Sequence, residues 1–330
     1  MHLVVSEYGL SVGKTSERVT IRREGKVVGE TPVEDVESLL LASEGISIST
    51  DVLEMCAARG VPVTFLRRDG EPYARLSSAL AGGDVGLRQA QLEARHDQRG
   101  VRLAIAFVTG KLRNQSANLV YFGRSRPGIA LLATARKHID ALAAEAGRLQ
   151  AADCEQARVP LVALEAQAAK HYWEAIAAIL PPTLAFPGRE RRGATDPVNQ
   201  ALNYGYGILY SQVWAQLVIV GLDPFCGYVH VDRVNAPTLV FDFIEEYRQA
   251  VVDRPVLGWL LKGGRPVGDG GGLSWETRRR LAELVLGRLN SAQAYGGKQV
   301  RLLDVMRAEA YEVAAAVRGQ REHDPWLGSW

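Results

Sequence analysis

The spacing of apolar residues changes character at Gly82-Gly83-Asp84, and no other feature of the sequence constrains the fold as strongly. Before this point, short apolar or alternating runs lie between turn-forming residues, which is typical of β-strands. After it, the apolar residues recur with helical spacing and few breakers interrupt them. The 330 residues suffice for two domains at about 100–200 residues each. We therefore expect an α+β protein with two domains, residues 1–84 and residues 85–330.

The first domain is predicted to be a small β-sandwich, because several short strands alternate with turn signals. The predicted strands are residues 3–6, 18–22, 26–28, 37–42, 46–48 and 61–66. One helix over residues 51–59 interrupts them, with Gly60 as its stop. Residues 13–15 (Gly-Lys-Thr) resemble the end of a phosphate-binding loop, but Tyr8 stands where that motif requires its first glycine. We interpret this segment as a turn between strands.

The second domain is predicted to be an all-α helical bundle. A helix start is marked by Asp196 and Pro197, because aspartate caps a first turn and proline suits the first helical position. A further helix is predicted to begin at residues 235–237 and to end before Pro255. From Arg318 the sequence is polar, and we expect a mobile tail. The other predicted helices cover residues 87–110, 129–149, 162–180, 196–220, 275–289 and 302–317.

The composition excludes several classes of protein. The formal net charge is only +2, from 39 basic and 37 acidic side chains, so local basic patches would have to hold any polyanion. Cys56, Cys154 and Cys226 are odd in number and widely spaced, which argues against a disulfide framework or a zinc knuckle. The most apolar window, residues 213–222, is far shorter than the roughly 20 residues of a membrane span. Without a signal-peptide pattern, the sequence predicts a soluble, cytoplasmic protein with no membrane association.

An acidic pair near a histidine forms the first candidate site. Asp242 and Glu245 are three residues apart in a predicted helix, so their carboxylates share one face. Asp242 lies among apolar neighbours, where an ionised carboxylate is costly unless a partner such as a cation compensates. His230 precedes this helix and could complete a metal site. The alternative is a solvated acidic face with a structural histidine, and these residues alone do not decide between the two.

Glu165 is a further acidic candidate, in a different predicted helix. The turn before it is wholly apolar, and Ala168 and Ala169 lie on the same helical face. Such small side chains allow another backbone or a ligand to approach closely. The alternative is an exposed helix glutamate, because glutamate is a good helix former. The sequence alone leaves both interpretations open.

Basic residues supply candidate contacts to phosphate groups. Arg189, Arg191 and Arg192 precede a predicted helix start, and guanidinium groups bind phosphate through paired hydrogen bonds. We expect this loop to form a phosphate cradle. Lys111 belongs to a second polar group, residues 111–115, which we place between two helices. We expect Lys111 to contact DNA phosphate as well.

Five segments, in this order, resemble the CRISPR-associated integrase family of spacer acquisition, whose members are also described as endonucleases (the Cas-one family). The match extends over nearly the whole chain, and the shared order makes the resemblance specific. The segments are residues 60–70 with their glycine turn, the Lys-x-x-Asn-Gln group at 111–115, the helix at 164–172, the Asp-Pro-x-Asn helix at 196–206 and the block at 223–255.

The resemblance implies a metal-dependent catalytic site in the helical domain. It implies that Glu165, His230 and Glu245 bind the metal ion directly, with Asp242 in a supporting catalytic role. Two carboxylates and one imidazole suit Mg²⁺ or Mn²⁺. The departures from the family pattern leave this ligand set intact: Ala166 and Gln167 stand where glycine is frequent, Val229 replaces a usual leucine, and Glu245 stands where many members have aspartate.

The same resemblance implies the function of a DNA integrase and endonuclease. The 3′-hydroxyl of a foreign DNA fragment would attack a phosphodiester of CRISPR repeat DNA, and the fragment would become a new spacer; with water as nucleophile, the same site would cleave DNA. The implied partners are double-stranded DNA fragments, repeat DNA, a second copy of the chain joined through the N-terminal domain, and a small CRISPR-associated adaptation protein. A structure-specific repair nuclease and a non-catalytic DNA-binding scaffold stay open as alternatives.

Overall fold

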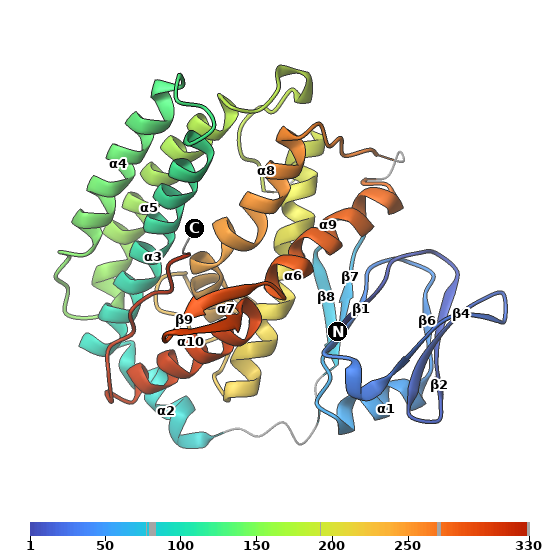
Figure 1. Cartoon of the computed structure of the whole chain (residues 1–330). Helices are drawn as coiled ribbons and strands as arrows, with labels where there is room; N and C mark the ends of the chain where they lie inside the picture. The colour runs from blue at the N-terminus through green and yellow to red at the C-terminus, as the bar shows by residue number, and fades with distance from the viewer. Residues whose placement is uncertain (77, 79–83, 192, 269–271, 329–330) are drawn as a thin grey trace.

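The computed structural model describes the chain except residues 77, 79–83, 192, 269–271 and 329–330. Its N-terminal part contains two four-stranded sheets, ordered β1-β5-β7-β8 and β4-β3-β2-β6, together with α1 (Thr50–Ala58). These elements lie together at the lower right of Figure 1. The strands are β1 (His2–Val5), β2 (Leu10–Thr15), β3 (Arg18–Arg23), β4 (Lys26–Pro32), β5 (Ser38–Leu41), β6 (Ser47–Ile48), β7 (Val63–Leu66) and β8 (Pro72–Leu76).

The predicted turn at Gly13-Lys14-Thr15 is wrong, because these residues are the second half of β2. This strand pairs antiparallel with β3, and Val12 lies opposite Ile21. Alternate residues of its first half, Leu10 and Val12, are buried, as expected for a strand with one face on a core. The predicted strands at residues 18–22 and 26–28 are present as β3 and β4, which pair antiparallel, whereas β8 was not predicted.

Strand β5 is buried on both faces and joins two hydrophobic cores. Leu39 and Leu41 pack with the small core between the strands and α1. Leu40, whose side chain points to the opposite face, packs with the core of the helical part. A strand buried on both faces reads as a continuous apolar run, which explains the Leu-Leu-Leu sequence. The β-rich part is therefore packed against the helices through its own sheet.

The chain after residue 84 is mostly helical, and Figure 1 shows α3, α4 and α5 side by side on the left. The expectation of an all-α region is wrong, because the hairpin β9 (Ala292–Tyr295) and β10 (Lys298–Arg301) lies between the last two helices. The helices are α2 (Val85–Ala94), α3 (Gln98–Gly123), α4 (Ala130–Ala146), α5 (Cys154–Ala177), α6 (Pro197–Val220), α7 (Thr238–Phe243), α8 (Arg254–Leu261), α9 (Trp275–Leu289) and α10 (Leu302–Val317). Short 3-10 turns cover Pro182–Leu184 and Ile244–Glu246, and a π-turn covers Gln249–Asp253.

Three predicted helix limits are wrong in ways that concern the site. Residues 111–115 lie within α3, not between two helices. Helix α5 begins eight residues earlier than predicted, since Asp153 caps its first turn and Pro160 is accommodated inside it. The chain also stays helical through Pro255, because the π-turn runs directly into the first turn of α8, where a proline is tolerated.

The prediction of a mobile tail from Arg318 is wrong for His323, Pro325 and Trp326, which are buried, whereas residues 318–322 are exposed. The His323 side chain is fully buried, and Trp326 is 5% exposed. The Trp326 ring stacks on Tyr247, with ring centroids 5.4 Å apart and planes 12° apart. The polar sequence misled the prediction because its polar groups are satisfied inside the protein rather than by water.

Close backbone contact joins the β-rich part to α6. The turn before β8 places Gly70 against Gly207, and a Cβ built on Gly207 would lie 1.8 Å from the Gly70 carbonyl oxygen. Arg278 of α9 donates a hydrogen bond of 3.0 Å to the Ala42 carbonyl oxygen. Within the described residues, no helix is long and apolar enough to cross a membrane.

Candidate active site

Two acidic side chains from separate elements meet at one ammonium group. Glu165 lies in the middle of α5, Lys111 lies in α3, and Glu245 lies in the 3-10 turn after α7. The Lys111 Nζ donates a hydrogen bond to Glu165 Oε1 and lies 2.7 Å from Glu245 Oε2. Arg248 Nε lies 2.8 Å from Glu245 Oε1. The fold therefore brings both carboxylates to a shared cation.

Asp242 holds the backbone and the ring of His230. Its two carboxylate oxygens accept hydrogen bonds from the backbone N–H groups of Tyr228, Val229 and His230, at 2.6, 3.0 and 3.1 Å. The His230 Nδ1 lies 2.6 Å from Asp242 Oδ1. Gly227 leaves room for this carboxylate, because a Cβ there would lie 2.8 Å from Asp242 Oδ2. The buried charge of Asp242 is thus compensated by protein donors, not by the cation that the sequence suggested.

The charges of the site stabilise one another despite burial. Burial disfavours the Glu245 carboxylate, but Arg248 and Lys111 outweigh this cost and hold the pKa of Glu245 below its usual value. Burial likewise disfavours the Lys111 ammonium, and Glu165 and Glu245 raise its pKa above the usual value instead. The pKa of His230 is raised, because Asp242 and the two glutamates outweigh the burial of the ring.

The donor set fits a divalent cation in its chemistry. With Nδ1 held by Asp242, His230 has Nε2 free for a ligand, and metal-binding histidines usually have such a carboxylate partner. Glu245 Oε2 is buried and accepts no well-directed hydrogen bond from the described residues. As the described side chains lie, however, no three His, Cys, Asp or Glu groups surround a common point. The Lys111 ammonium lies between the two glutamates, so a metal ion would require this side chain to move.

The predicted phosphate-binding arginines are partly engaged within the protein. Arg189 donates hydrogen bonds to the side-chain oxygens of Asn199 and Asn203, at 2.9 and 2.6 Å. The guanidinium of Arg191 lies over the Phe241 ring, 5.6 Å from its centroid. Arg192 falls outside the described residues. Contacts of these residues with phosphate stay a prediction.

Sequence reasoning gave no role to several residues beside the site. Arg248 lies three residues after Glu245, a spacing that places both side chains on one helical face and could have indicated the ion pair. Asp253 is buried and accepts hydrogen bonds from the hydroxyls of Tyr172 and Tyr206. No local signal in the sequence could have indicated this group, because Asp253, Tyr172 and Tyr206 lie in three segments that are far apart in the chain.

Comparisons with known proteins agree over the length of the chain. Residues 3–267 match the family described as CRISPR associated protein Cas1. A CRISPR-associated endonuclease Cas1 from Archaeoglobus fulgidus is 33% identical over 347 residues, covering 100% of both chains. Among solved structures, a casposase bound to an integration product has a TM-score of 0.82 at 18% identity, covering 99% of this chain and 93% of the other. A chain of a Cas6-RT-Cas1–Cas2 complex has a TM-score of 0.81 at 20% identity, covering 100% of this chain and 36% of the other.

Proposed function

The chain belongs to the Cas1 family of CRISPR-associated proteins, and from this premise we propose that it inserts foreign DNA fragments into a CRISPR array as new spacers. The reaction is a transesterification: a 3′-hydroxyl of the fragment forms a bond to a phosphorus atom of repeat DNA while the bond to the leaving oxygen breaks. With water as the nucleophile, the same site hydrolyses DNA, which agrees with the name of the Archaeoglobus fulgidus relative, an endonuclease.

The observation that carries the proposal is the meeting of Glu165 and Glu245 at one cation, beside a histidine oriented by a buried aspartate. Glu165, Glu245 and the His230 Nε2 would hold a Mg²⁺ or Mn²⁺ ion. When bound, such an ion polarises the scissile phosphate and stabilises charge on the leaving oxygen. Asp242 acts through His230, because its hydrogen bond to Nδ1 sets the orientation of the ring.

Lys111 and Arg248 contribute positive charge at the same place. Both are ion-paired with Glu245, and the lowered pKa of Glu245 keeps that carboxylate ionised and ready to bind a cation. If Glu245 and Glu165 held a metal ion, the ammonium and guanidinium groups would be available to the phosphates of DNA. The released Lys111 ammonium group would then contact a phosphate group of the DNA.

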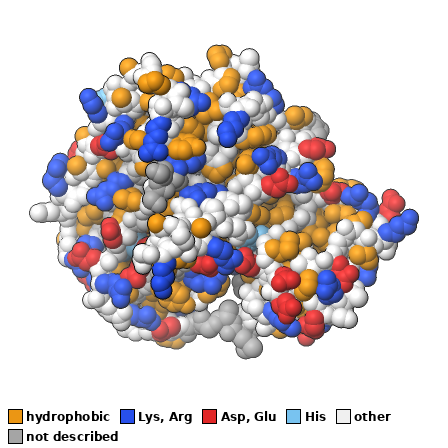
Figure 2. Space-filling model, viewed as in Figure 1, with side chains coloured by type: hydrophobic (Ala, Val, Ile, Leu, Met, Phe, Trp, Pro, Cys, Tyr) orange, Lys and Arg blue, Asp and Glu red, His pale blue; other side chains and the backbone are white. Residues whose placement is uncertain are grey.

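We further propose that the protein acts as a homodimer with a small adaptation protein of the Cas2 type. The Cas6-RT-Cas1–Cas2 complex, whose matching chain shares the fold of this protein, supports the second partner. Double-stranded fragments and repeat DNA need basic surface, and Figure 2 shows Lys and Arg side chains spread over the upper half of the helical part in this view, with few acidic groups among them. The N-terminal part is proposed to form the dimer contact.

The experiment that tests the function is strand transfer by the Glu165→Gln variant. We expect this variant to lose joining of a free 3′ end into a repeat-bearing plasmid by at least about 10³-fold, because a neutral amide is a poor metal ligand and the charge at the scissile phosphate is then uncompensated. Glu174→Gln is the matched control, since Glu174 is an exposed glutamate of the same helix. Joining by Glu165→Gln at the level of the control would refute the assignment. Plasmid cleavage without joining by the wild-type protein would favour a repair nuclease.

A further inference from the structure

Residues 323–328, which we name the C-terminal clasp, lie inside the helical part beside the candidate site. The His323 ring is fully buried and lies 5.7 Å from the Phe107 ring, measured between centroids. Trp326 stacks on Tyr247, two residues beyond Glu245. The clasp therefore contacts α3 through Phe107 and the segment that carries Glu245 through Tyr247.

The clasp binds both carboxylate oxygens of Glu246. His323 Nε2 lies 2.8 Å from Glu246 Oε1, and the Trp326 backbone N–H donates a hydrogen bond of 3.0 Å to Glu246 Oε2. Glu246 is fully buried, so its charge would be costly without these partners. Burial disfavours the imidazolium of His323, but Glu246, with Glu309 at 3.6 Å from Nδ1, raises its pKa above the usual value. The His323 imidazole is therefore the side-chain partner of the buried Glu246 carboxylate.

Asn114 ties the clasp to α3 and to the 3-10 turn at once. Its amide nitrogen donates hydrogen bonds of 2.9 Å to the backbone carbonyl oxygens of Glu246 and Trp326. Its amide oxygen accepts a hydrogen bond of 2.9 Å from the Gly328 N–H. The side chain is fully buried, and all of these contacts depend on the clasp or on residue 246.

The residues held in this way are sequence neighbours of the site. Asn114 lies one turn after Lys111 on α3, and Glu246 follows Glu245 directly. The relative position of Lys111 and Glu245 is therefore set by the same backbone that Asn114 and the clasp connect. The clasp touches neither carboxylate of the predicted metal site, so any effect on that site passes through these neighbours.

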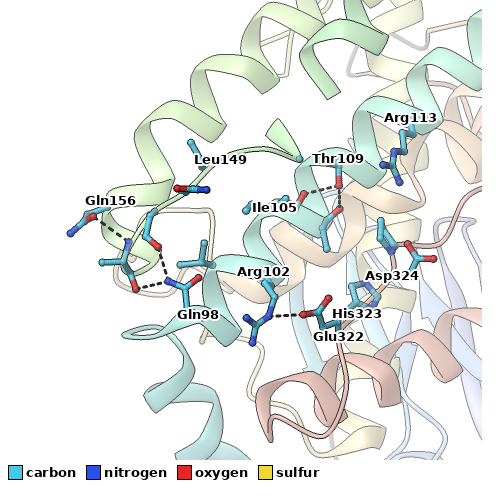
Figure 3. Close-up of a pocket in the computed structure, with 17 residues that line it drawn as sticks. Gln98, Arg102, Ile105, Thr109, Arg113, Leu149, Gln156, Glu322, His323 and Asp324 are labelled. Atoms are coloured by element: carbon cyan, nitrogen blue, oxygen red, sulfur yellow. Dashed lines mark hydrogen bonds and ion pairs between the residues drawn. The ribbon is translucent and has the colours of Figure 1, made fainter. Parts of the chain in front are cut away.

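An open cavity of about 890 Å³ borders the other side of this segment. Figure 3 shows Leu149 and Gln156 on one side of it, and Glu322, His323 and Asp324 across from them. On the protein side, the clasp is held by hydrogen bonds with Glu246 and Asn114. It also packs tightly on α3, because a Cβ built on Gly110 would lie 2.6 Å from the Pro325 Cβ.

We propose that the C-terminal clasp is a positioning element of the active site, which holds Glu245 and Lys111 in register with Glu165 through Glu246 and Asn114. This inference rests on the proposed function. It assigns a role to His323, Asn114 and Glu246 that is distinct from metal binding: none of them touches the metal or the DNA, and they act by fixing the backbone on which two site residues stand.

The test is the affinity for Mn²⁺, measured by calorimetry on the full-length protein and on two variants. His323→Ala removes the side-chain partner of Glu246. Gly110→Ala removes no polar group, but its Cβ would lie 2.6 Å from the Pro325 Cβ and 3.2 Å from the Glu246 Cγ, so these residues must shift. We expect the dissociation constant for Mn²⁺ to rise about tenfold or more in both, the range seen when groups behind metal ligands are removed. Glu322→Gln is the matched control, because Glu322 lies next to the clasp, is exposed, and pairs only with Arg102 at 3.3 Å among the described residues.

Circular dichroism and thermal unfolding separate positioning from stability. A purely structural role would lower the melting temperature and leave the Mn²⁺ affinity of the folded protein unchanged, and that result would overturn the proposal. Should His323→Ala fail to fold, Gly110→Ala decides the question alone, since alanine is favourable in a helix. If the wild-type protein binds Mn²⁺ and both variants bind it with the same affinity, the proposed role of the clasp is refuted. The proposed function is not affected by that result. Wild-type protein that binds no Mn²⁺ refutes the function, and the clasp with it.

Discussion

At the scale of single residues, Asp242 shows how one side chain can orient several groups of a site. Its carboxylate collects three consecutive backbone N–H groups and the ring nitrogen of His230. These hydrogen bonds fix the extended segment that delivers the imidazole. A ring held at Nδ1 presents Nε2 in a defined direction, which is the property a metal ligand needs.

Replacement of Asp242 is therefore expected to affect two measurable quantities. Asp242→Asn keeps an acceptor oxygen but loses the charge, and we expect Mn²⁺ affinity to fall about 10–100-fold. Asp242→Ala leaves three buried N–H groups unpaired, and we expect it to lower the free energy of unfolding by about 2–4 kcal/mol as well. Calorimetry and urea unfolding measure the two effects. Asp232→Asn is the control, because Asp232 is an exposed acid in the loop between His230 and α7 and pairs with Arg95. Wild-type affinity in Asp242→Asn would contradict the account.

The site residues differ in how far the sequence could predict them. The three-residue spacing of Asp242 and Glu245, and the resemblance to a known family, indicated which residues matter. They did not indicate that Lys111 would lie between Glu165 and Glu245, since Lys111 is 54 residues from Glu165 in the chain. Contacts at such separations depend on how helices pack, and helix periodicity carries no information about the partner helix.

At the scale of elements, Asp253 joins three of them at a buried point. The carboxylate belongs to the π-turn before α8 and accepts hydrogen bonds from Tyr172 of α5 and Tyr206 of α6. Burial raises the pKa of Asp253 from 3.8 to about 6, although the tyrosine hydroxyls and nearby arginines oppose this shift. Because the folded protein binds this proton more tightly than the unfolded chain, the group stabilises the fold below about pH 4, and this contribution is lost as pH rises through about 6.

The prediction compares the free energy of unfolding of the wild type with that of Asp253→Asn. The free energy of unfolding of wild type relative to the variant should fall by on the order of 2 kcal/mol between pH 4 and pH 7. The comparison cancels the titration of other groups, because Asp253 is the only change. Urea unfolding at several pH values measures it, and a difference that is constant with pH would show that Asp253 titrates normally.

Elements whose ends carry strong local signals were predicted well. Helices α9 and α10 begin and end at the predicted residues, and Asp196 caps α6 as expected, with its side chain accepting a hydrogen bond from the Asn199 N–H. The β9–β10 hairpin was missed although the Gly296-Gly297 turn between its strands is a recognisable hairpin signal. The burial of His323 and Trp326 could not be predicted, because the partners of their segment lie up to 214 residues away in the sequence.

At the scale of the whole molecule, the β-rich part and the helices are in direct backbone contact at a joint, and no side chain would fit between the two backbones there. Strand β5 contributes to both cores, and Gly70 lies directly against Gly207 of α6. Gly70 also has a φ of +89°, a conformation that favours glycine. The position of the sheets relative to the helical part is thus determined by direct packing, and the joint is stiff where these two glycines meet.

We expect Gly207→Ala to destabilise the protein by about 2–3 kcal/mol, because the added methyl group overlaps the Gly70 carbonyl and both backbones must shift. Gly287→Ala is the matched control. Gly287 is an exposed residue within α9, and a Cβ there meets nothing within 4 Å. That substitution should raise the free energy of unfolding by about 0.5–1 kcal/mol through helix propensity. Equal free energies of unfolding of Gly207→Ala and Gly287→Ala, measured with urea, would show that the backbones at Gly70 and Gly207 move apart at little cost.

The buried clasp also has a consequence for biosynthesis. A ribosome makes residues 323–328 after it has made Asn114 and Glu246, and the N-terminal strands and most helices can fold while synthesis continues. Until the last of these residues has emerged, Glu246 has no imidazole beside it and Asn114 has only one of its backbone partners. A nascent chain from which residues 323–328 have not yet emerged therefore carries the candidate site without the contacts of the clasp.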